Sequence, residues 1–232
     1  MVVESAVTRR LLLTALVAAL LSIGILAQGV PVVPTIVRPA TATKPAGAGG
    51  FLQRWLILEP IAVPGQLTDS AVRATVSREY FPGQLTSMPK GGDSVTVDGK
   101  PLQWHAVDTT GYNVNLFHFA SGLKKPTSNV LFWIVTVVRA PQDVPIARLA
   151  IGSNAASVWW LDGREVVSLF NDRQTVIDDG VSKRVALKKG GNVVRAAIIN
   201  AGGATDFCAR FLDANARPIT GLTIDLAAAP GS

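Results

Sequence analysis

The chain has 232 residues, a formal net charge of +6 and a single cysteine. Without the first 50 residues, 18 basic and 15 acidic residues remain, spread along the sequence. The basic pairs lie in or beside predicted turns, which favours solvated loops over a nucleic-acid-binding surface, since such a surface needs a basic stripe with interleaved aromatic residues. A single cysteine excludes an intramolecular disulfide. Cys208 stands between Phe207 and Ala209, where a small buried hydrophobic residue fits; an intermolecular bridge or a reactive thiol are the alternatives.

The first 29 residues have the pattern of an export signal. Arg9 and Arg10 precede the apolar run Leu11–Ala27, and Ala27-Gln28-Gly29 offers small residues at the two positions that a signal peptidase inspects. This order predicts a secretory signal peptide with cleavage after Gly29. The run has 17 residues, close to the minimum length of a membrane-spanning helix, so an uncleaved membrane anchor is the alternative. We therefore expect a periplasmic or secreted protein that contacts a membrane only if this segment is retained.

A linker and one folded domain are expected after the leader. Residues 30–50 are rich in Pro, Ala, Thr and Gly and show no sustained periodicity, which predicts a linker. Residues 51–228 are numerous enough for one domain with a sizeable core.

Short apolar runs separated by turn residues predict strands through most of this domain. Residues 129–139, NVLFWIVTVVR, are rich in β-branched and aromatic residues and predict a central buried strand. Residues 69–78 fit either a short helix or an irregular strand, and their periodicity does not decide between them. The other expected strands are 51–58, 94–97, 101–104, 112–119, 146–151, the two that meet at Asp162-Gly163, 192–200, a short one ending at 210, and 219–226.

Two dipeptides predict tight hairpins. Asp98-Gly99 and Asp162-Gly163 favour positive φ at both positions, which a two-residue hairpin turn requires. Many short strands without long helical periodicity predict an all-β fold, a two-layer antiparallel β-sandwich.

Several motifs occur in an order that is similar to a known family. They are RWLILEP at 54–60, a Gly…Trp segment at 99–104, Trp-Leu-Asp-Gly at 160–163, LKKGGN at 187–192 and RFLD at 210–213. Together they resemble the galactose-binding-like domain, a jelly-roll β-sandwich appended to many bacterial carbohydrate-active enzymes. The resemblance runs from Phe51 to about Thr223. It implies a non-catalytic module that binds carbohydrate.

One segment departs from the family pattern. Related sandwiches place paired acids after Gly-Ser, whereas this chain has Asn154 and Ala155 after Gly152-Ser153. A hard cation needs several oxygen ligands, usually with carboxylates among them. We therefore expect no metal site there, and the acids at 172, 178 and 179 are interpreted as a solvated hairpin rim rather than a calcium cage.

Aromatic and polar side chains supply candidates for sugar binding. Aromatic rings stack on sugar C–H faces, and Asn or His side chains can complete the hydroxyl hydrogen bonds. Trp159 and Trp160 point to opposite faces of a strand, so both can be core only if the sheet is covered twice. Core packing is the competing interpretation for each tryptophan, and a solvent-facing strand surface is the competing one for the polar residues. The candidate ligand-binding residues are Trp104, His105, Tyr112, Asn113, Asn115 and Trp159.

No residue pattern specifies a reaction. Two histidines are present, no Gly-x-Ser-x-Gly elbow occurs, and nothing selects a carboxylate pair for glycoside hydrolysis. We therefore predict a non-enzymatic protein with no catalytic residues and no cofactor, and a polysaccharide or glycan as the partner. The alternative is a secreted or envelope module that binds a protein instead of a glycan.

Overall fold

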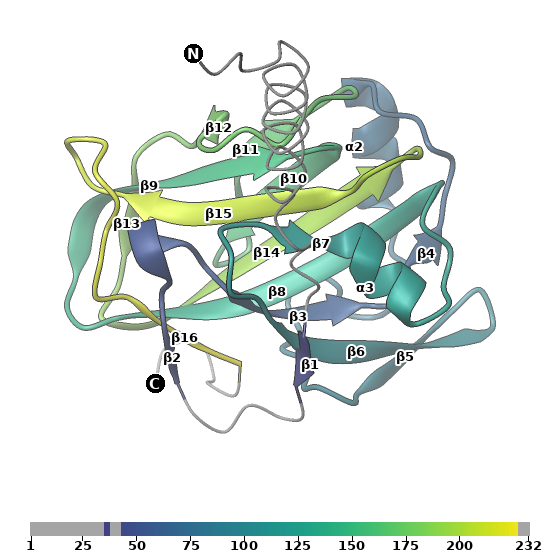
Figure 1. Cartoon of the computed structure of the whole chain (residues 1–232), viewed down its shortest axis with the longest axis horizontal. Helices are drawn as coiled ribbons and strands as arrows, with labels where there is room; N and C mark the ends of the chain where they lie inside the picture. Colours follow the sequence, from purple (N-terminus) through teal and green to yellow (C-terminus); the bar gives the residue numbers. More distant parts are fainter. Residues whose placement is uncertain (1–34, 38–42, 227–232) are drawn as a thin grey trace, which may run out of the picture. The chain divides into compact units, whose positions relative to one another are not determined.

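The computed structural model describes residues 35–37 and 43–226, and strands dominate this part of the chain (Figure 1). The strands are β1 (Thr35–Val37), β2 (Lys44–Pro45), β3 (Arg54–Leu58), β4 (Ile61–Ala62), β5 (Ser94–Val97), β6 (Lys100–Asp108), β7 (Val114–Asn115), β8 (Val130–Ala140), β9 (Val144–Ser153), β10 (Ala156–Leu161), β11 (Arg164–Leu169), β12 (Gly180–Val181), β13 (Val185–Leu187), β14 (Gly190–Asn200), β15 (Asp206–Leu212) and β16 (Thr223–Asp225). The helices are the 3-10 turn η1 (Ala48–Gly50), α2 (Asp69–Ser77) and α3 (Leu116–Gly122).

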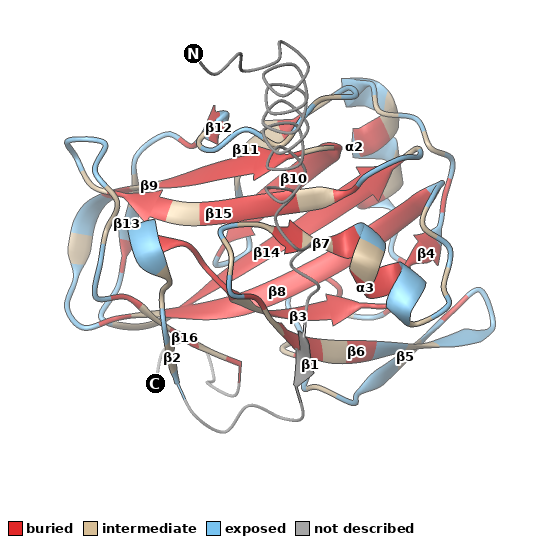
Figure 2. Ribbon diagram, viewed as in Figure 1, coloured by how far each residue is buried: buried red, intermediate tan, exposed pale blue. Residues whose placement is uncertain are grey.

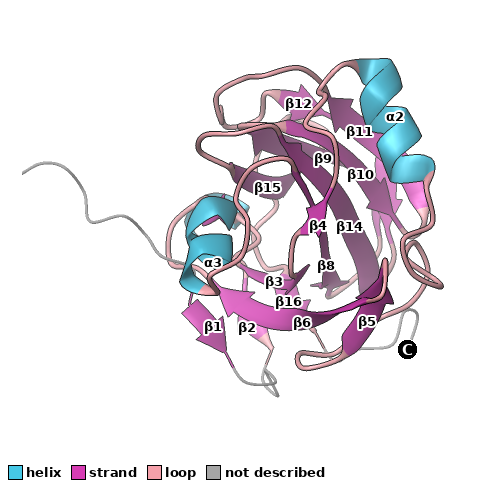
Figure 3. Cartoon of the chain, turned by 90° about the vertical axis from the view of Figure 1, so that its right-hand side faces the viewer, coloured by secondary structure: helices cyan, strands magenta, loops and turns pink. Residues whose placement is uncertain are grey.

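The strands form two antiparallel sheets, which confirms the predicted all-β sandwich (Figure 3). The large sheet has the strand order β1-β6-β3-β8-β14-β10-β11, and β2, β4, β5 and β16 pair outside this path. Its centre is the β8–β14 pair, whose register runs from Ala140 opposite Gly190 to Val130 opposite Asn200. The predicted central strand is thereby confirmed. The small sheet has the order β12-β9-β15-β7, with β13 also pairing with β9.

A first core, the inter-sheet core, fills the space between the two sheets (Figure 2). Three aromatic side chains from different strands meet at its centre. The ring of Trp55 lies 6.0 Å from that of Trp159 and 5.2 Å from that of Phe207, both in edge-to-face geometry. Such aromatic contacts add to the area that the rings bury, and they join β3 and β10 of the large sheet to β15 of the small sheet.

A second core, the helix-side core, covers the opposite face of the large sheet. Val72 and Val76 of α2 belong to it, together with Phe81 from the segment that follows this helix. Alternate residues of a strand point to opposite faces, so Trp159 enters the inter-sheet core and Trp160 the helix-side core. The large sheet is thus covered twice, and both tryptophans are buried.

Both predicted hairpin turns are confirmed. Asp98 and Gly99 have φ values of 47° and 76°, and they connect β5 to β6. Asp162 and Gly163 have φ values of 48° and 81°, and they connect β10 to β11. Glycine has no Cβ to oppose this backbone conformation, and aspartate adopts it more readily than most other residues.

Three segments differ from the sequence prediction or complete it. Residues 69–77 form a helix, which resolves the ambiguity left by their periodicity. Residues 112–119 are not one strand, because β7 ends at Asn115, whose side-chain oxygen accepts a hydrogen bond from the His118 amide and caps α3. Within the predicted linker, β1 pairs with β6 and β2 pairs with β16, so the sandwich includes residues before Phe51.

The predicted leader falls outside the described residues. Across residues 43–226, no helix is both long enough and apolar enough to cross a membrane.

Candidate functional site

The two tryptophans predicted as stacking platforms are buried. Trp104 of β6 is 3% exposed and packs edge-to-face against Phe81, with 6.2 Å between ring centroids. Trp159 is fully buried, and its indole nitrogen donates a hydrogen bond to the Ser157 hydroxyl at 3.0 Å. A ring that stacks on a sugar must present a face to solvent, and neither ring does. The structure therefore contradicts the prediction for both residues, because the large sheet is covered on both faces.

His105 belongs to a charged cluster at the start of the domain. Its Nε2 lies 3.4 Å from Oε1 of Glu59, and Oε2 of Glu59 lies 2.9 Å from Nζ of Lys125. Burial raises the pKa of Glu59, but hydrogen bonds from Lys125 and His105 outweigh it and leave this pKa below its ordinary value. His105 is mostly buried, so it contributes little to an exposed ligand surface.

Tyr112 is exposed, and Asn113 beside it in the chain is partly exposed. The Tyr112 side chain is 46% exposed, and its ring lies 5.8 Å from the ring of Phe51. Asn113 donates a hydrogen bond from Nδ2 to Oδ2 of Asp206 at 3.0 Å. Asn115, by contrast, uses its side-chain oxygen to cap α3. Of the six predicted residues, the structure thus brings Tyr112 and Asn113 into one exposed surface.

A buried glutamine fixes the loop that carries Tyr112. Gln53 is 8% exposed, and its amide nitrogen donates hydrogen bonds to the carbonyl oxygens of Thr110 at 3.0 Å and Gly111 at 2.8 Å. These two bonds hold the backbone immediately before Tyr112, so the ring projects from a tethered loop.

Further polar residues reach the same surface from the segment between β11 and β12. The Thr175 hydroxyl donates to the Asp206 side chain and lies 3.3 Å from the Asp206 carbonyl oxygen. Arg210 lies over the Phe51 ring, with its guanidinium carbon 4.8 Å from the centroid, and its Nε donates to Asp178 at 2.9 Å. We call Tyr112, Asn113, Thr175, Asp206 and Arg210, together with the buried ring of Phe51 that Tyr112 and Arg210 contact, the Tyr112 surface.

The sequence did not point to four members of this surface. Phe51 is an ordinary start of an apolar strand, and Thr175 and Asp206 lie in polar stretches without a motif. In the sequence, Arg210 belongs only to the RFLD segment. Asn113 and Asp206 are 93 positions apart, and no periodicity or spacing connects them, so only the fold brings them together.

Two of the acids after β11, Asp178 and Asp179, are paired with arginines. Asp178 pairs with Arg210, and Asp179 pairs with Arg173 through Nε at 3.0 Å. Asn154 uses its backbone, donating to the Asp206 carbonyl oxygen at 3.0 Å. Among the residues that the structure describes, no group of three His, Cys, Asp or Glu side chains is arranged to hold a metal ion.

Comparison with known proteins gave similar solved structures only. No family model matches the sequence, and no curated protein matches it. A PA14 sugar-binding domain from an RTX adhesin is 11% identical, with 74% of this chain and 96% of that chain covered and a TM-score of 0.44. The PA14 domain of the antifreeze protein MpAFP is 10% identical, with 82% and 96% covered and a TM-score of 0.42.

A third similar structure is a fungal adhesin domain. The subtype-switched Epithelial Adhesin 9 A domain from Candida glabrata, in complex with β-lactose, is 9% identical, with 84% of this chain and 97% of that chain covered and a TM-score of 0.38. All three TM-scores are low, and these similarities assign neither a family nor a ligand to this chain.

Proposed function

We propose that this chain is an exported, non-catalytic module that binds carbohydrate through the Tyr112 surface. The observation that carries the proposal is the half-exposed ring of Tyr112, which precedes Asn113 in the chain, and the hydrogen bond that joins the Asn113 side chain to Asp206. An aromatic ring can stack on the C–H face of a sugar ring, while amide and carboxylate oxygens accept hydrogen bonds from its hydroxyl groups.

The carboxylate of Asp206 can accept further hydrogen bonds from a ligand. Each carboxylate oxygen of Asp206 can accept more than one hydrogen bond. Oδ2 accepts one from Asn113, and Oδ1 accepts one from Thr175. These contacts hold the carboxylate in one orientation before a sugar arrives. A group that is already oriented loses less side-chain entropy on binding, which favours affinity.

Support for export and for the absence of catalysis comes from the sequence. The charged and apolar leader predicts export. No nucleophile, general base or carboxylate pair is specified by a motif, and the proposed surface works by contact alone. The carbohydrate would be a cell-wall or plant polysaccharide, with the ring of Tyr112 on a sugar face.

Affinity electrophoresis against a panel of polysaccharides tests the proposal. We expect at least one glycan to retard the wild-type protein and to bind Tyr112→Ala about tenfold more weakly, since a stacked aromatic contact contributes about 0.5–1.5 kcal/mol beyond its buried area. Phe117→Ala is the matched control, because Phe117 is also an exposed aromatic residue but lies on α3. Absence of retardation by every glycan, or equal loss in both variants, would contradict the proposal.

One observation favours the alternative of a protein-binding module. Val176, Ile177 and Val181 are exposed apolar side chains within one short segment of the chain. If the glycan panel is negative and a pull-down recovers one stoichiometric protein that Val176→Ser releases, the alternative replaces the proposal.

A further inference from the structure

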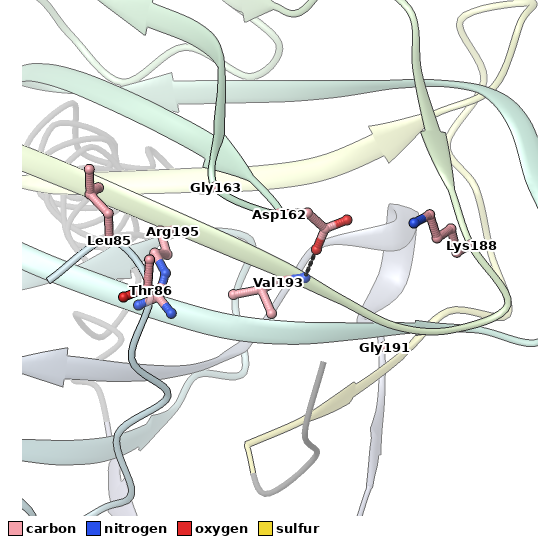
Figure 4. A pocket seen from close by; sticks show the side chains of 8 residues that line it. All are labelled: Leu85, Thr86, Asp162, Gly163, Lys188, Gly191, Val193 and Arg195. Atoms are coloured by element: carbon pink, nitrogen blue, oxygen red, sulfur yellow. Dashed lines mark hydrogen bonds between the residues drawn. The ribbon is translucent and has the colours of Figure 1, made fainter. Parts of the chain in front are cut away.

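A pocket of about 380 Å³ opens on the helix-side face of the large sheet, apart from the residues of the Tyr112 surface. It is bounded by the segment that precedes β5, by the β10–β11 turn, by the β13–β14 turn and by one face of β14 (Figure 4). Its lining residues are Leu85, Thr86, Asp162, Gly163, Lys188, Gly191, Val193 and Arg195.

The most unusual group in this pocket is the guanidinium of Arg195. Its position on β14 places the side chain on the same face as Val193 and Ala197, both of which belong to the helix-side core. Arg195 is 4% exposed, although the surrounding face is apolar. A buried charge is normally paired with an opposite charge, because desolvation is otherwise costly.

No protein carboxylate neutralises Arg195 within the described part of the chain. Its Nη2 donates to the carbonyl oxygen of Ser87, a neutral acceptor, and it forms no ion pair with Asp or Glu there. Burial lowers the pKa of Arg195 to about 10, so the side chain is still charged at neutral pH. One carbonyl leaves most of the five guanidinium N–H groups without a protein acceptor.

The other end of the pocket carries polar groups with a different role. Figure 4 shows Arg195 and Thr86 on one side of Val193, and Asp162 and Lys188 on the other. Asp162 accepts a hydrogen bond from the Val193 amide through Oδ1 at 2.7 Å, which orients its carboxylate. Lys188 is exposed, and among the described residues it has no ion-pair partner. Val193 forms an apolar floor between the two ends.

We propose that this pocket binds a small organic ligand through its carboxylate, with Arg195 as the counter-charge and with Asp162 and Lys188 contacting polar groups at the ligand's other end. A planar guanidinium matches a planar carboxylate through two parallel hydrogen bonds. The carboxylate of Asp162 opposes a strongly charged anion but accepts hydrogen bonds from hydroxyl or ammonium groups. A uronic acid and an amino acid both carry this combination, so either is a source of the ligand chemistry.

Titration calorimetry on the full-length chain tests the proposal with four probes. D-Galacturonate and L-alanine supply the carboxylate with hydroxyl or ammonium groups, D-galactose lacks the carboxylate, and inorganic phosphate lacks the organic body. We expect one of the two carboxylates to bind and the galactose and phosphate to bind at least about tenfold more weakly, as expected for loss of a charge-assisted hydrogen bond. The carboxylate that binds identifies the source. Equal binding of galacturonate and galactose, binding of phosphate alone, or binding of no probe would overturn the proposal.

Variants locate the binding in the pocket. Arg195→Met should abolish measurable carboxylate binding, and Arg195→Lys should restore part of it, whereas Arg217→Met removes an exposed arginine on the turn after β15 and should change nothing. Tyr112→Ala should also leave this binding intact, which separates it from the proposed glycan surface.

A second measurement covers the case in which Arg195 variants fail to fold. The Nε–H resonance of Arg195 in the wild-type protein should shift on titration with the binding carboxylate and not with galactose. Lys188→Met, at an exposed position, should weaken binding several-fold without affecting folding. An unmoved Arg195 resonance together with unchanged binding by Lys188→Met would contradict the proposal.

Discussion

Glu59 shows how a single carboxylate can make stability depend on pH. It is 8% exposed and contacts both His105 and Lys125. Burial alone would raise its pKa, yet the hydrogen bonds to these two residues lower it below the value in the unfolded chain. A group whose pKa is lower in the folded state stabilises the fold above its unfolded pKa, and this stabilisation is lost as the pH falls through the folded pKa.

We therefore expect Glu59→Gln to lower the free energy of unfolding at neutral pH by about 1.5 kcal/mol, the size of a hydrogen bond to a charged group. The difference from wild type should shrink in acid, where Glu59 is protonated in both states. Urea unfolding at neutral and acidic pH measures both values. Glu79→Gln, at an exposed glutamate, is the control and should differ little from wild type at either pH. A difference that stays constant with pH would show that the contacts of Glu59 are not ionic.

The tryptophans show where residue-level reasoning from sequence stops. Alternation along β10 correctly predicted that Trp159 and Trp160 point in opposite directions. It did not predict that both faces of the sheet are covered, because the covering residues, such as Val72 and Phe81, come from a segment about 80 positions away without clear periodicity. Tyr112 and Asn113 could be chosen from the sequence, but Asp206, the hydrogen-bond partner of Asn113, could not.

At the scale of elements, the segment between β11 and β12 is held against the small sheet. A Cβ placed on Gly152 would collide with the carbonyl oxygen of Val176 and would lie 3.0 Å from Sγ of Cys208. Cys208 is buried at this contact, and burial raises its pKa to about 11. A thiol in such an environment is largely unreactive, because the thiolate is the nucleophile.

Gly152→Ala should therefore lower the free energy of unfolding by about 1–3 kcal/mol, as overpacking does, and should expose Cys208 by displacing this segment. The rate at which a disulfide reagent modifies Cys208 in the folded protein should rise several-fold, and urea unfolding gives the stability. Gly122→Ala is the matched control, since a Cβ there meets nothing within 4 Å. Unchanged thiol reactivity in Gly152→Ala would mean that the segment does not protect Cys208.

Local sequence predicts some of the turns, helices and strands but not others. Both Asp-Gly hairpins were predicted because the turn chemistry lies within two residues. The helix α3 was missed because its seven residues are too few for a periodic pattern and because its start depends on one capping side chain, Asn115. The strand β2, which lies within the predicted linker, could not be predicted locally because it gains its hydrogen bonds from β16, far along the chain.

At the scale of the whole molecule, the large sheet acts as the middle of three layers. Trp160→Ala should therefore lower the free energy of unfolding by about 3–5 kcal/mol, the cost of deleting a fully packed tryptophan. Trp159→Ala should cost a similar amount, since its ring is buried on the other face. Tyr112→Ala, at a half-exposed ring, should cost less than either. Urea unfolding of the three variants compares them, and a small effect for Trp160→Ala would contradict a covered outer face.

The pairing of β8 with β14 has a consequence for the order of events in folding. Their paired residues are 50 positions apart at Ala140 and Gly190 and 70 apart at Val130 and Asn200, and β16 must still reach β8 from residues 223–225. Contacts of such high sequence separation slow folding, because the intervening chain loses entropy before the contacts form. The hairpins β5–β6 and β10–β11 can close early, but the sheet centre forms only once β14 has been synthesised. A chain emerging from the ribosome therefore stays incompletely folded until nearly all of its strands are available.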